Sequence, residues 1–506
     1  MSEVRDVVVV GGGLGGLAAA LTCAKQGLDV VLFEQHSKVG GCASSFHRKG
    51  YNFEVALHAQ NGRAKDNQIL QFFDILPLIQ PIQLKEWYRV QVEKVPGGGS
   101  LDFHMPIGWE AAQNAMTEAF PKAEANVRAW FEFTETLVQE IMMLMGFAPP
   151  VKGAPRFLTD WGMRTLQEAL DYFFKKHEGA KLAAGAAWNW LGQGPDTLSI
   201  INFAMGFQYY LKEGGWQLRE GSQSLAQAYA TRLAEAGAEI RVKTPVEGVH
   251  VAQNQADHVV LTGGERVQAR YFVWNGSAGP LFRDRLQGNP SPKILEYGTR
   301  LSQLKGTMSF TSLFLGIDGD VSDYLPDYER IWFPDKISAS SLQSRINKGS
   351  PEAAGWLITN YSKLGSPWFA PAGKSNVVIT LFDSIERWPA RNMPQYKRMK
   401  QQATDQIWKS VQETLGLDFE EQVEYLELAT PRTYERYLWT EWGTAYGYNA
   451  TPDQIGPLRP AQHTPITNLW LAGQWTQPGH GFDPCQASGF LAGKAICEAL
   501  GVWEQK

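Results

Sequence analysis

The sequence predicts an α/β fold, in which a Rossmann-type dinucleotide-binding domain is built from separate segments and joined to a discontinuous α+β substrate or lid domain. Three observations predict this fold. A strand, a glycine-rich turn, a helix and a second strand follow one another over residues 6–34. A strand, a glycine and a helix recur over 466–500, and further strand patterns lie between, over 239–272. Parallel strands linked by helices are typical of this fold class.

The first element is a strand over 6–10, where a run of valines after Asp6 indicates burial on both faces of a parallel sheet. We expect a helix over 17–25 that ends at Gly27, and a second strand over 29–33. Strand, turn, helix and strand in this order form the first half of a nucleotide-binding unit.

The turn between the first strand and the helix has the pattern G-x-G-x-x-G. Gly11 permits the tight turn, Gly13 lets a pyrophosphate approach the backbone, and Gly16 lets the helix pack on the strand. Free N–H groups and the helix dipole then attract phosphate. Glu34 follows the second strand, where a carboxylate accepts hydrogen bonds from ribose hydroxyls and repels the 2′-phosphate of NADP. The site is therefore expected to take FAD or NAD.

The segment after Glu34 favours FAD over NAD. Residues 39–46 read VGGCASSF, so the glycine pair Gly40-Gly41 follows the acidic residue closely. This arrangement is typical of two-dinucleotide-binding flavoproteins, in which the glycine pair lets the backbone lie against FAD. A plain NAD dehydrogenase usually continues with another α/β unit at this point.

The far end of the chain is expected to complete the same site. A strand over 466–474 leads through a loop over 475–483 to a helix over 484–500. The N-terminus of this helix would stabilise negative charge on a flavin ring. The alternative is an ordinary closing αβ unit. Under both interpretations the first and last segments meet, so the domain is discontinuous.

The middle of the chain contributes a helix over 221–235, a strand pair over 239–251 and a strand over 266–272. The first of these strands would place the backbone before Val246 near the adenine. The residues expected to bind the dinucleotide lie in the loops named above: Gly11, Gly13, Leu14, Gly15, Gly16, Glu34, Gln35, Gly41, Cys42, Ala43, Val246, Asn275, Gly473, Gln474, Asp483, Pro484, Gln486 and Ala487.

Domain boundaries follow from these segments. The dinucleotide-binding domain is expected over 1–85, 215–300 and 430–506, and the substrate or lid domain over 86–214 and 301–429. The chain has 18 tryptophans, many of them in the two lid segments. Tryptophan buries a large apolar surface, so this enrichment indicates either an aromatic core or an apolar ligand tunnel.

Composition excludes several classes of protein. The 506 residues are 44 % hydrophobic, which is a globular composition, and the net charge of −5 without a basic stretch argues against nucleic acid as a partner. The four cysteines lack C-x-x-C spacing, which predicts a reducing compartment such as the cytoplasm. No histidine pattern typical of a metal site and no G-x-S-x-G nucleophile motif occurs, so no metal is expected.

Two stretches raise the question of membrane contact. The apolar run over 7–24 has no basic segment before it and contains five glycines, which favours strand, turn and helix over a signal peptide. Residues 130–147 form an amphipathic helix pattern whose polar face carries Glu132, Glu135 and Glu140. An acidic face favours an internal lid helix over a membrane-surface helix. Peripheral membrane contact remains the alternative.

Two groups of motifs resemble one family of flavoproteins. The N-terminal group comprises 34–46, GYNFE at 50–54 and Leu57-His58. The C-terminal group includes TPRTY at 430–434 and NLWLAGQ at 468–474. In this order they resemble the superfamily of phytoene desaturase, carotenoid isomerase and retinol saturase (all-trans-retinol 13,14-reductase). The resemblance extends from residue 6 to the last helix.

The resemblance implies a glutathione-reductase-like FAD-binding Rossmann domain and a hydrophobic substrate domain. It implies an FAD-dependent oxidoreductase that acts on C=C bonds of a lipophilic polyene, such as a carotenoid or retinoid. Saturation, desaturation and redox-neutral cis–trans isomerisation through reduced flavin all fit. The chain departs from the family's motifs at 53–56, 219–221 and 477–485, where flavin and substrate are expected to meet.

Four residues are the candidates for acid–base chemistry. His58 and His480 come first, because histidine titrates near neutrality and can protonate an intermediate on carbon. A structural, hydrogen-bonded role is the alternative for each. Glu54 and Asp483 are the further candidates, and Asp483 is equally suited to capping the last helix.

Two other functions use the same features. An amine or amino-acid oxidase would place a lysine near the flavin and an aromatic cage around the amine. Lys305 could serve as that lysine, although a solvent-exposed strand start suits it better, and the cage could comprise Trp439, Trp442, Trp470 and Trp475. The third function is a non-catalytic, flavin-bound lipid-binding protein.

Overall fold

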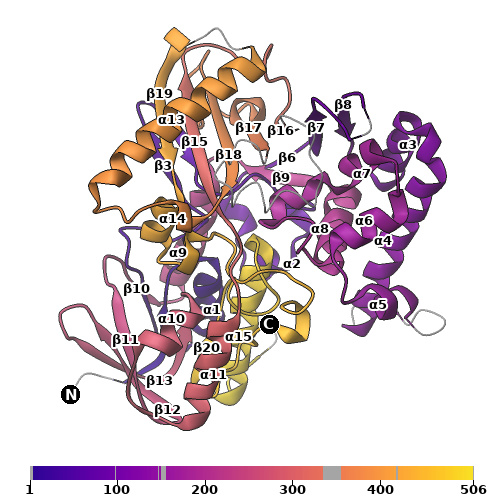
Figure 1. Cartoon of the computed structure of the whole chain (residues 1–506). Helices are drawn as coiled ribbons and strands as arrows, with labels where there is room; N and C mark the ends of the chain where they lie inside the picture. Colours follow the sequence, from indigo (N-terminus) through magenta and orange to yellow (C-terminus); the bar gives the residue numbers. More distant parts are fainter. Residues whose placement is uncertain are drawn as a thin grey trace.

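Two large β-sheets and a lobe of helices make up the chain (Figure 1). The computed structural model describes residues 4–96, 98–145, 148–149, 155–333, 355–416 and 420–504. The two termini lie close to the first sheet, which both ends of the chain help to build. The predicted α/β fold class is thereby confirmed, whereas the domain boundaries given above stay a prediction.

The first sheet has eight strands. Their order is β10 (Glu239–Arg241), β2 (Val30–Phe33), β1 (Arg5–Val10), β13 (Arg266–Trp274), β12 (Gln255–Leu261), β11 (Val246–Gln253) and β14 (Leu286–Pro290), and β20 (Leu469–Leu471) also pairs with β13. The strands β10, β2, β1, β13 and β20 run parallel. The parallel half is therefore the nucleotide-binding core that the valine run indicated.

Helices cover both faces of this sheet, which explains why its strands are continuously apolar. On one face, Val7 and Val9 pack against α1 (Leu14–Lys25), α9 (Ser222–Glu235) and α15 (Phe482–Ala499). On the other face, Val8 and Val10 belong to a core shared with β11, β12 and α11 (Pro292–Gln303). The first and last helices of the chain, α1 and α15, lie against each other.

Several predicted elements differ from the observed ones. The first helix begins at Leu14 and not at 17, because Gly15 and Gly16 are helical. The predicted pair over 239–251 is two strands that do not pair with each other: β10 joins β2, and β11 lies between β12 and β14. The predicted strand over 466–474 is only Leu469–Leu471, since Gly473 adopts φ +84° immediately afterwards.

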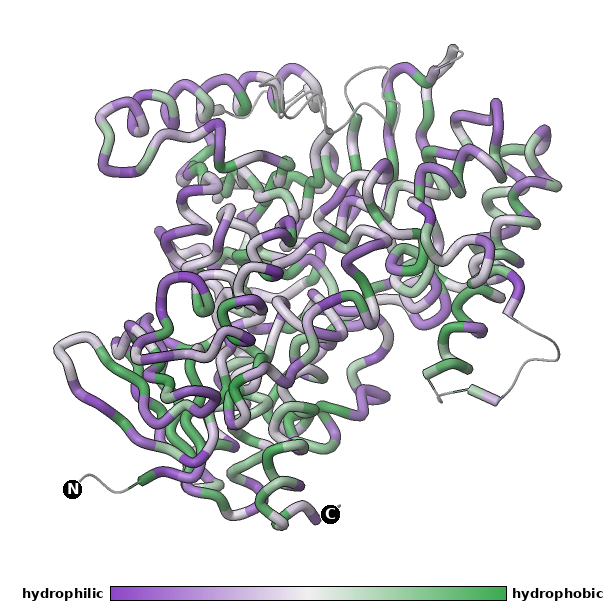
Figure 2. Tube along the Cα trace, turned by 60° about the horizontal axis from the view of Figure 1, so that its bottom comes forward, coloured by the Kyte–Doolittle hydropathy of each residue, from purple (hydrophilic) through white to green (hydrophobic). Residues whose placement is uncertain are grey.

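The second sheet has seven strands. Their order is β19 (Val423–Ala429), β15 (Ser309–Ile317), β18 (Ser375–Asp383), β17 (Trp356–Asn360), β16 (Glu329–Phe333), β7 (Tyr88–Val92) and β8 (Leu101–Met105). All neighbours are antiparallel except β16 and β7. Helix α13 (Pro394–Leu415) covers one face of this sheet. It is the long helix at the upper left of Figure 2, where hydrophobic and hydrophilic residues alternate along it.

A helical lobe packs beside β7 and β8 and shares one core with the second sheet. It contains α3 (Trp109–Ala119), α4 (Glu124–Leu144), α5 (Arg156–Trp161), α6 (Leu166–Phe174), α7 (Glu178–Gly185) and α8 (Ile200–Glu213). Short elements connect it to the first sheet: α2 (Gln68–Phe72), the hairpin β3 (Ser45–Arg48) and β4 (Tyr51–Glu54), and the small sheet of β5 (Gln60–Asn61), β9 (Gly215–Leu218) and β6 (Pro81–Gln83).

Helix α4 is the amphipathic segment predicted over 130–147, of which residues 146 and 147 lie outside the described residues. Trp130 and Phe133 are fully buried, so this part of the stripe faces the protein interior. Glu140 was placed on the polar face, which is wrong: it is buried and accepts hydrogen bonds from the backbone N–H groups of Arg156, Phe157 and Leu158 at the start of α5. Capping of a neighbouring helix explains its burial.

The described part of the chain contains no helix with both the length and the apolar character that a membrane crossing needs. Peripheral membrane contact stays a prediction.

Candidate functional site

A cavity of about 670 Å³ extends from the glycine-rich turn of the first sheet to the second sheet and the helical lobe. One part is lined by backbone, with Gly11, Gly13 and Gly15 from the turn. The other part is lined by apolar and aromatic side chains of the second sheet and the lobe. A polar backbone cradle thus opens directly into an apolar chamber.

The glycine-rich turn fits a bound pyrophosphate. Gly11 adopts φ +98°, which side chains rarely tolerate. A Cβ at Gly15 would lie 2.6 Å from the backbone N of Gly473, and a Cβ at Gly13 would lie 2.9 Å from Nδ2 of Asn275. Helix α1 starts directly at this turn, and its N-cap, Gly13, offers no side-chain hydrogen bond, so the first N–H groups remain available to phosphate.

Glu34 and the second glycine pair complete the cradle. The buried Glu34 carboxylate accepts hydrogen bonds from the backbone N–H of Gly12 (2.7 Å) and of His36 (2.8 Å), which fixes it beside the turn. Gly41 adopts φ +60°, and a Cβ there would come within 3.3 Å of the Gly13 backbone. Both segments line the cavity, as the spacing of acid and glycine pair predicted.

The start of α15 forms the opposite end of the cradle. Its N-cap is Gly481, so Asp483 is not the cap but lies in the first helical turn. Asn67 donates a hydrogen bond to Asp483 over 2.9 Å, and burial raises the pKa of this carboxyl to about 6. Asp483 therefore exchanges its proton near pH 6 and stays about one-tenth protonated at pH 7, unlike an exposed aspartate.

The sequence pointed to the two lid segments as the source of an apolar tunnel, but to no individual lining residue. Its lining side chains come from the lobe, from the second sheet and from the segment after β19: Trp190, Leu191, Met205, Tyr209, Tyr210, Phe310, Leu357, Phe382, Tyr434 and Tyr446. One local signal was available. Asn202, Met205, Gly206 and Tyr209 line the cavity and recur at helical spacing along α8, which marks one face of that helix.

His58 lines the cavity and is held by buried polar groups behind it. Its Nδ1 lies 2.8 Å from Oγ1 of Thr359 and 3.1 Å from Oε1 of Glu329. Glu329 is 2 % exposed. A carboxylate at Nδ1 fixes the tautomer with the proton on Nδ1, which leaves Nε2 as the basic nitrogen. No sequence motif points to Glu329, because the contact joins β16 to the loop after β4.

His480 also lines the cavity, but its environment differs. Burial, and then the positive charge of Arg459, lower the pKa of His480 to about 3. The imidazole is thus neutral, and its Nδ1 is buried without a hydrogen-bond partner among the described residues. It stands edge-on to Tyr446. His480 suits a hydrogen bond to a bound ligand better than proton donation.

Glu54 lies outside the cavity lining. Its carboxylate accepts hydrogen bonds from the backbone N–H and the hydroxyl of Ser222, each over 2.6 Å, at the start of α9. Burial raises the pKa of Glu54 to about 7, although the two hydrogen bonds from Ser222 oppose the shift. The geometry gives Glu54 a structural role at the end of a helix.

The raised pKa of Glu54 makes stability depend on pH. The folded protein keeps this proton up to about pH 7, whereas the unfolded chain releases it near the ordinary value of 4.5. Folding stability is therefore lost as pH rises between these values, by about 3 kcal/mol. We expect Glu54→Gln, which imitates the neutral acid, to raise the melting temperature relative to wild type at about pH 8.

The comparison is made at two pH values, because other groups titrate in the same interval. At about pH 5 both proteins carry a neutral side chain at position 54, so their melting temperatures are expected to converge. If the melting temperatures of wild type and Glu54→Gln differ by the same amount at both pH values, the prediction that burial raises the pKa of Glu54 is wrong. Glu118→Gln, the same substitution at an exposed glutamate of α3, serves as the matched control.

The features expected of an amine oxidase are not assembled. Lys305 is exposed and precedes β15, as expected for a solvated strand start, and among the described residues no lysine lines the cavity. Trp439 and Trp475 line it, whereas Trp470 lies in β20 beside His463. The four tryptophans therefore do not form one cage.

Most residues predicted to contact the dinucleotide line this cavity: Gly11, Gly13, Leu14, Gly15, Glu34, Gln35, Gly41, Cys42, Ala43, Val246, Asn275, Gly473, Gln474, Asp483, Pro484 and Ala487. Gly16 and Gln486 do not. A Cβ at Gly16 would overlap the carbonyl oxygen of Gly11, so this glycine serves helix packing. The buried Gln486 accepts a hydrogen bond from the Tyr229 hydroxyl over 2.6 Å.

Comparisons with known proteins agree with this site. A family model described as flavin containing amine oxidoreductase matches residues 14–497. All-trans-retinol 13,14-reductase of Homo sapiens is 24 % identical, over 98 % of this chain and 85 % of the relative. The chloroplastic prolycopene isomerase of Daucus carota is also 24 % identical, over 100 % of this chain and 82 % of the relative. The predicted resemblance is confirmed.

A solved structure supports the fold. Cyclohexylamine oxidase from Brevibacterium oxydans superimposes with a TM-score of 0.63 at 13 % sequence identity, over 99 % of this chain and 100 % of that chain. At this identity the likeness concerns the fold alone.

Proposed function

The chain belongs to the family of flavin-containing amine oxidoreductases, and from that premise we propose that it is an FAD-dependent oxidoreductase acting on C=C bonds of a hydrophobic polyene of the carotenoid or retinoid type. The observation that carries the proposal is one continuous cavity, in which the dinucleotide cradle opens into an apolar, aromatic chamber. A polyene offers no charge to bind, and this chamber is built to match apolar surface.

The residues present fit FAD. Gly11, Gly13 and the start of α1 would hold the pyrophosphate, and Glu34 would accept hydrogen bonds from a ribose. The start of α15 would lie at the flavin end, where its N–H groups favour negative charge. When bound, FAD supplies two-electron redox chemistry that no side chain offers.

The chain's own residues would orient the polyene, exclude water and handle the proton. The aromatic walls formed by Phe310, Phe382 and Tyr446 would position the conjugated chain and keep the site dry. His58 would exchange the proton at Nε2 with a polyene carbon, while Glu329 holds the ring by Nδ1. His480, which is neutral and has no partner at Nδ1 within the described part of the chain, would hydrogen-bond a polar end of the ligand.

The relatives support this substrate class. They are a reductase of all-trans-retinol and an isomerase of prolycopene, and both match this chain nearly from end to end. The amine-oxidase alternative draws support from the fold of cyclohexylamine oxidase. The cavity does not support this alternative, because none of the described lysines lines it.

The proposal is tested by photoreducing the purified FAD-loaded protein without oxygen and adding retinol or cis-carotenoids. Chromatography with mass detection then reads each product. A gain of two hydrogens would show saturation, and a changed retention at constant mass would show isomerisation. A loss of two hydrogens with the oxidised protein would show desaturation.

The outcome that contradicts the proposal is equally defined. If every polyene returns unchanged with both reduced and oxidised protein, a C=C substrate of this class is wrong. Hydrogen peroxide formation with a panel of primary amines would then establish the amine-oxidase alternative. Absence of turnover with either panel would favour a flavin-bound lipid-binding protein.

A further inference from the structure

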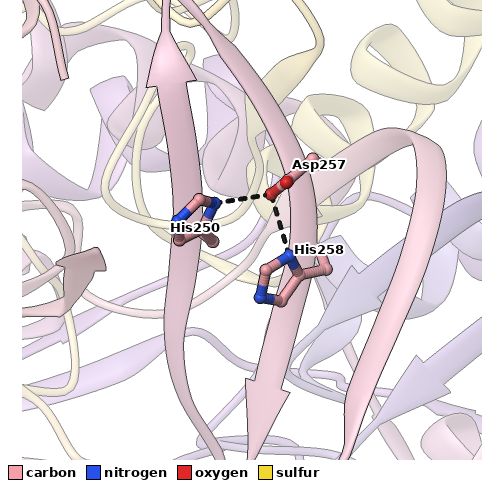
Figure 3. A group of neighbouring side chains, drawn as sticks. All are labelled: His250, Asp257 and His258. Atoms are coloured by element: carbon pink, nitrogen blue, oxygen red, sulfur yellow. Dashed lines mark hydrogen bonds and ion pairs between the residues drawn. The ribbon is translucent and has the colours of Figure 1, made fainter. Parts of the chain in front are cut away.

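Three side chains of the kinds that coordinate metal ions meet on the first sheet, and none of them lines the cavity. His250 lies on β11, and Asp257 and His258 lie on the neighbouring strand β12 (Figure 3). Nδ1 of His250 and Nδ1 of His258 each lie 2.9 Å from the same oxygen, Oδ1 of Asp257. Two imidazoles therefore converge on a single carboxylate oxygen.

A β-bulge makes this convergence possible. His250 pairs with His258 and Val251 pairs with Ala256, so Asp257 is an extra residue without a partner on β11. In a regular strand, neighbours such as Asp257 and His258 point to opposite faces. Bulges re-aim side chains, and this one brings the carboxylate to the histidines.

The surroundings leave the group accessible. The two imidazole rings stack, with centroids 4.7 Å apart and planes 13° apart. The His258 side chain is 9 % exposed, His250 34 % and Asp257 47 %, so the group is anchored on one side and open to solvent on the other. Gly288 of β14 has no side chain where a Cβ would lie 2.9 Å from Nε2 of His250, which gives the ring its space.

We propose that His250, Asp257 and His258 bind one divalent transition-metal ion, of the zinc, nickel or copper class. Two imidazole nitrogens and one carboxylate oxygen suit these ions, whereas magnesium and calcium prefer oxygen ligands only. The three ligand atoms lie within 4.8 Å of one another. Tetrahedral zinc places its ligand atoms about 3.3 Å apart, so the two 2.9 Å nitrogen–oxygen contacts need to open only slightly for an ion to enter between the ligand atoms, with water completing the coordination.

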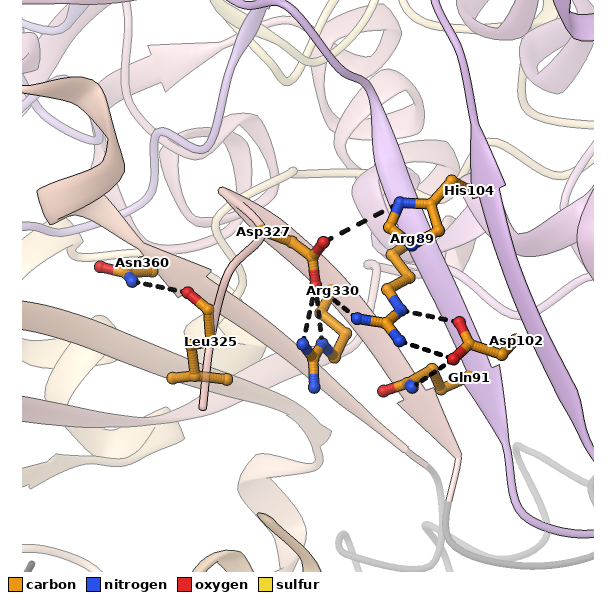
Figure 4. A network of polar contacts seen from close by, with 8 residues as sticks. All are labelled: Arg89, Gln91, Asp102, His104, Leu325, Asp327, Arg330 and Asn360. Carbon is orange, nitrogen blue, oxygen red and sulfur yellow. Dashed lines mark hydrogen bonds and ion pairs between the residues drawn. The ribbon is translucent and has the colours of Figure 1, made fainter. Parts of the chain in front are cut away.

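A second group of this kind is unsuited to a cation. Glu86, His104 and Asp327 also lie close together. However, Asp327 accepts hydrogen bonds from the guanidinium groups of both Arg89 and Arg330, at 3.2 and 2.7 Å (Figure 4). Two fixed positive charges already neutralise this carboxylate and repel a metal ion. By contrast, among the described residues no arginine forms an ion pair with Asp257, which pairs with the two histidines alone.

The metal would hold β11 to β12 across the bulge. A ligand that binds only the folded state stabilises it in proportion to the logarithm of its concentration over Kd. The site is distinct from the proposed flavin and polyene chemistry, so it stands whether or not that function is correct. It also departs from the expectation of no metal, because the cluster depends on a bulge that no linear motif reveals.

The test is calorimetric titration of the full-length FAD-loaded protein, freed of metal with EDTA, with zinc chloride. We expect one equivalent to bind and the melting temperature to rise. His250→Ala and His258→Ala are each expected to weaken binding more than tenfold, and Asp257→Asn to weaken it less. His104→Ala, from the second group, is the matched control and should bind zinc as wild type does.

Absence of stoichiometric binding, or binding that survives both histidine substitutions, would overturn the proposal. Copper(II) provides a measurement on the unmodified protein, in case a variant fails to fold. Its electron paramagnetic resonance spectrum is expected to show splitting from two nitrogen ligands, and a spectrum from oxygen ligands alone would overturn the proposal as well.

Discussion

Substitution of Gly489 by alanine is expected to abolish FAD retention and to lower the melting temperature sharply. Gly489 lies in α15 where this helix crosses α1, and an added Cβ would overlap the carbonyl oxygen of Gly15 and lie 2.9 Å from the backbone N of Ala19. The obstruction is backbone, which cannot rotate away as a side chain can. Overpacking of this kind costs about 1–3 kcal/mol or more.

The expected loss of cofactor follows from where the clash occurs. Gly15 belongs to the turn that lines the dinucleotide cradle, so displacement of α15 from α1 moves the N–H groups meant for phosphate. Flavin content is measured as visible absorbance relative to protein absorbance. Leu491→Ala is the matched control, because Leu491 belongs to the same helix but is 47 % exposed and lies outside the cavity lining. Wild-type flavin content in Gly489→Ala would contradict the prediction.

The dinucleotide half of the site was predictable because its signals are local. A valine run, three spaced glycines and Glu34 lie within a short stretch, and each residue type follows from a geometric need of the strand, the turn or the helix. Reasoning from local signals also placed the start of α1 too late, at residue 17 instead of Leu14. Glycine usually disfavours helix, but Gly16 is helical here because only a hydrogen atom fits against Gly11.

For the other half, the sequence indicated the lid segments but no individual residues, since this half is assembled over long distances in the chain. The apolar chamber takes side chains from the lobe, β15, β17 and β18, and none of these segments carries a motif. The candidates for acid–base chemistry show the same limit. Residue type alone ranked His58 and His480 equally, and only burial beside Arg459 makes His480 neutral. The partner of His58, Glu329, became visible only once β16 was placed.

Substitution of His58 is expected to have the largest effect on turnover of the proposed reaction. His58→Ala removes the nitrogen that would exchange the proton, so we expect kcat for the polyene to fall by about 10²–10⁴-fold with little change in KM. Flavin content should stay at the wild-type level, because the His58 ring contacts the second sheet, through Thr359 of β17 and Glu329 of β16. His177→Ala, at the start of α7 and outside the cavity lining, is the matched control.

Glu329 provides the decisive second substitution, because it touches His58 and not the cavity. Glu329→Gln keeps the shape but replaces the carboxylate that fixes Nδ1–H, so the imidazole is free to present the wrong tautomer at Nε2. We expect a smaller fall in kcat than for His58→Ala, and we expect the double variant to be no worse than His58→Ala alone, since residues that act as one unit are not additive. If the two effects instead multiply, Glu329 supports the cavity independently and His58 acts without it. If His58→Ala retains wild-type kcat, the proton must come from solvent or from Asp483, whose pKa of about 6 leaves it partly protonated.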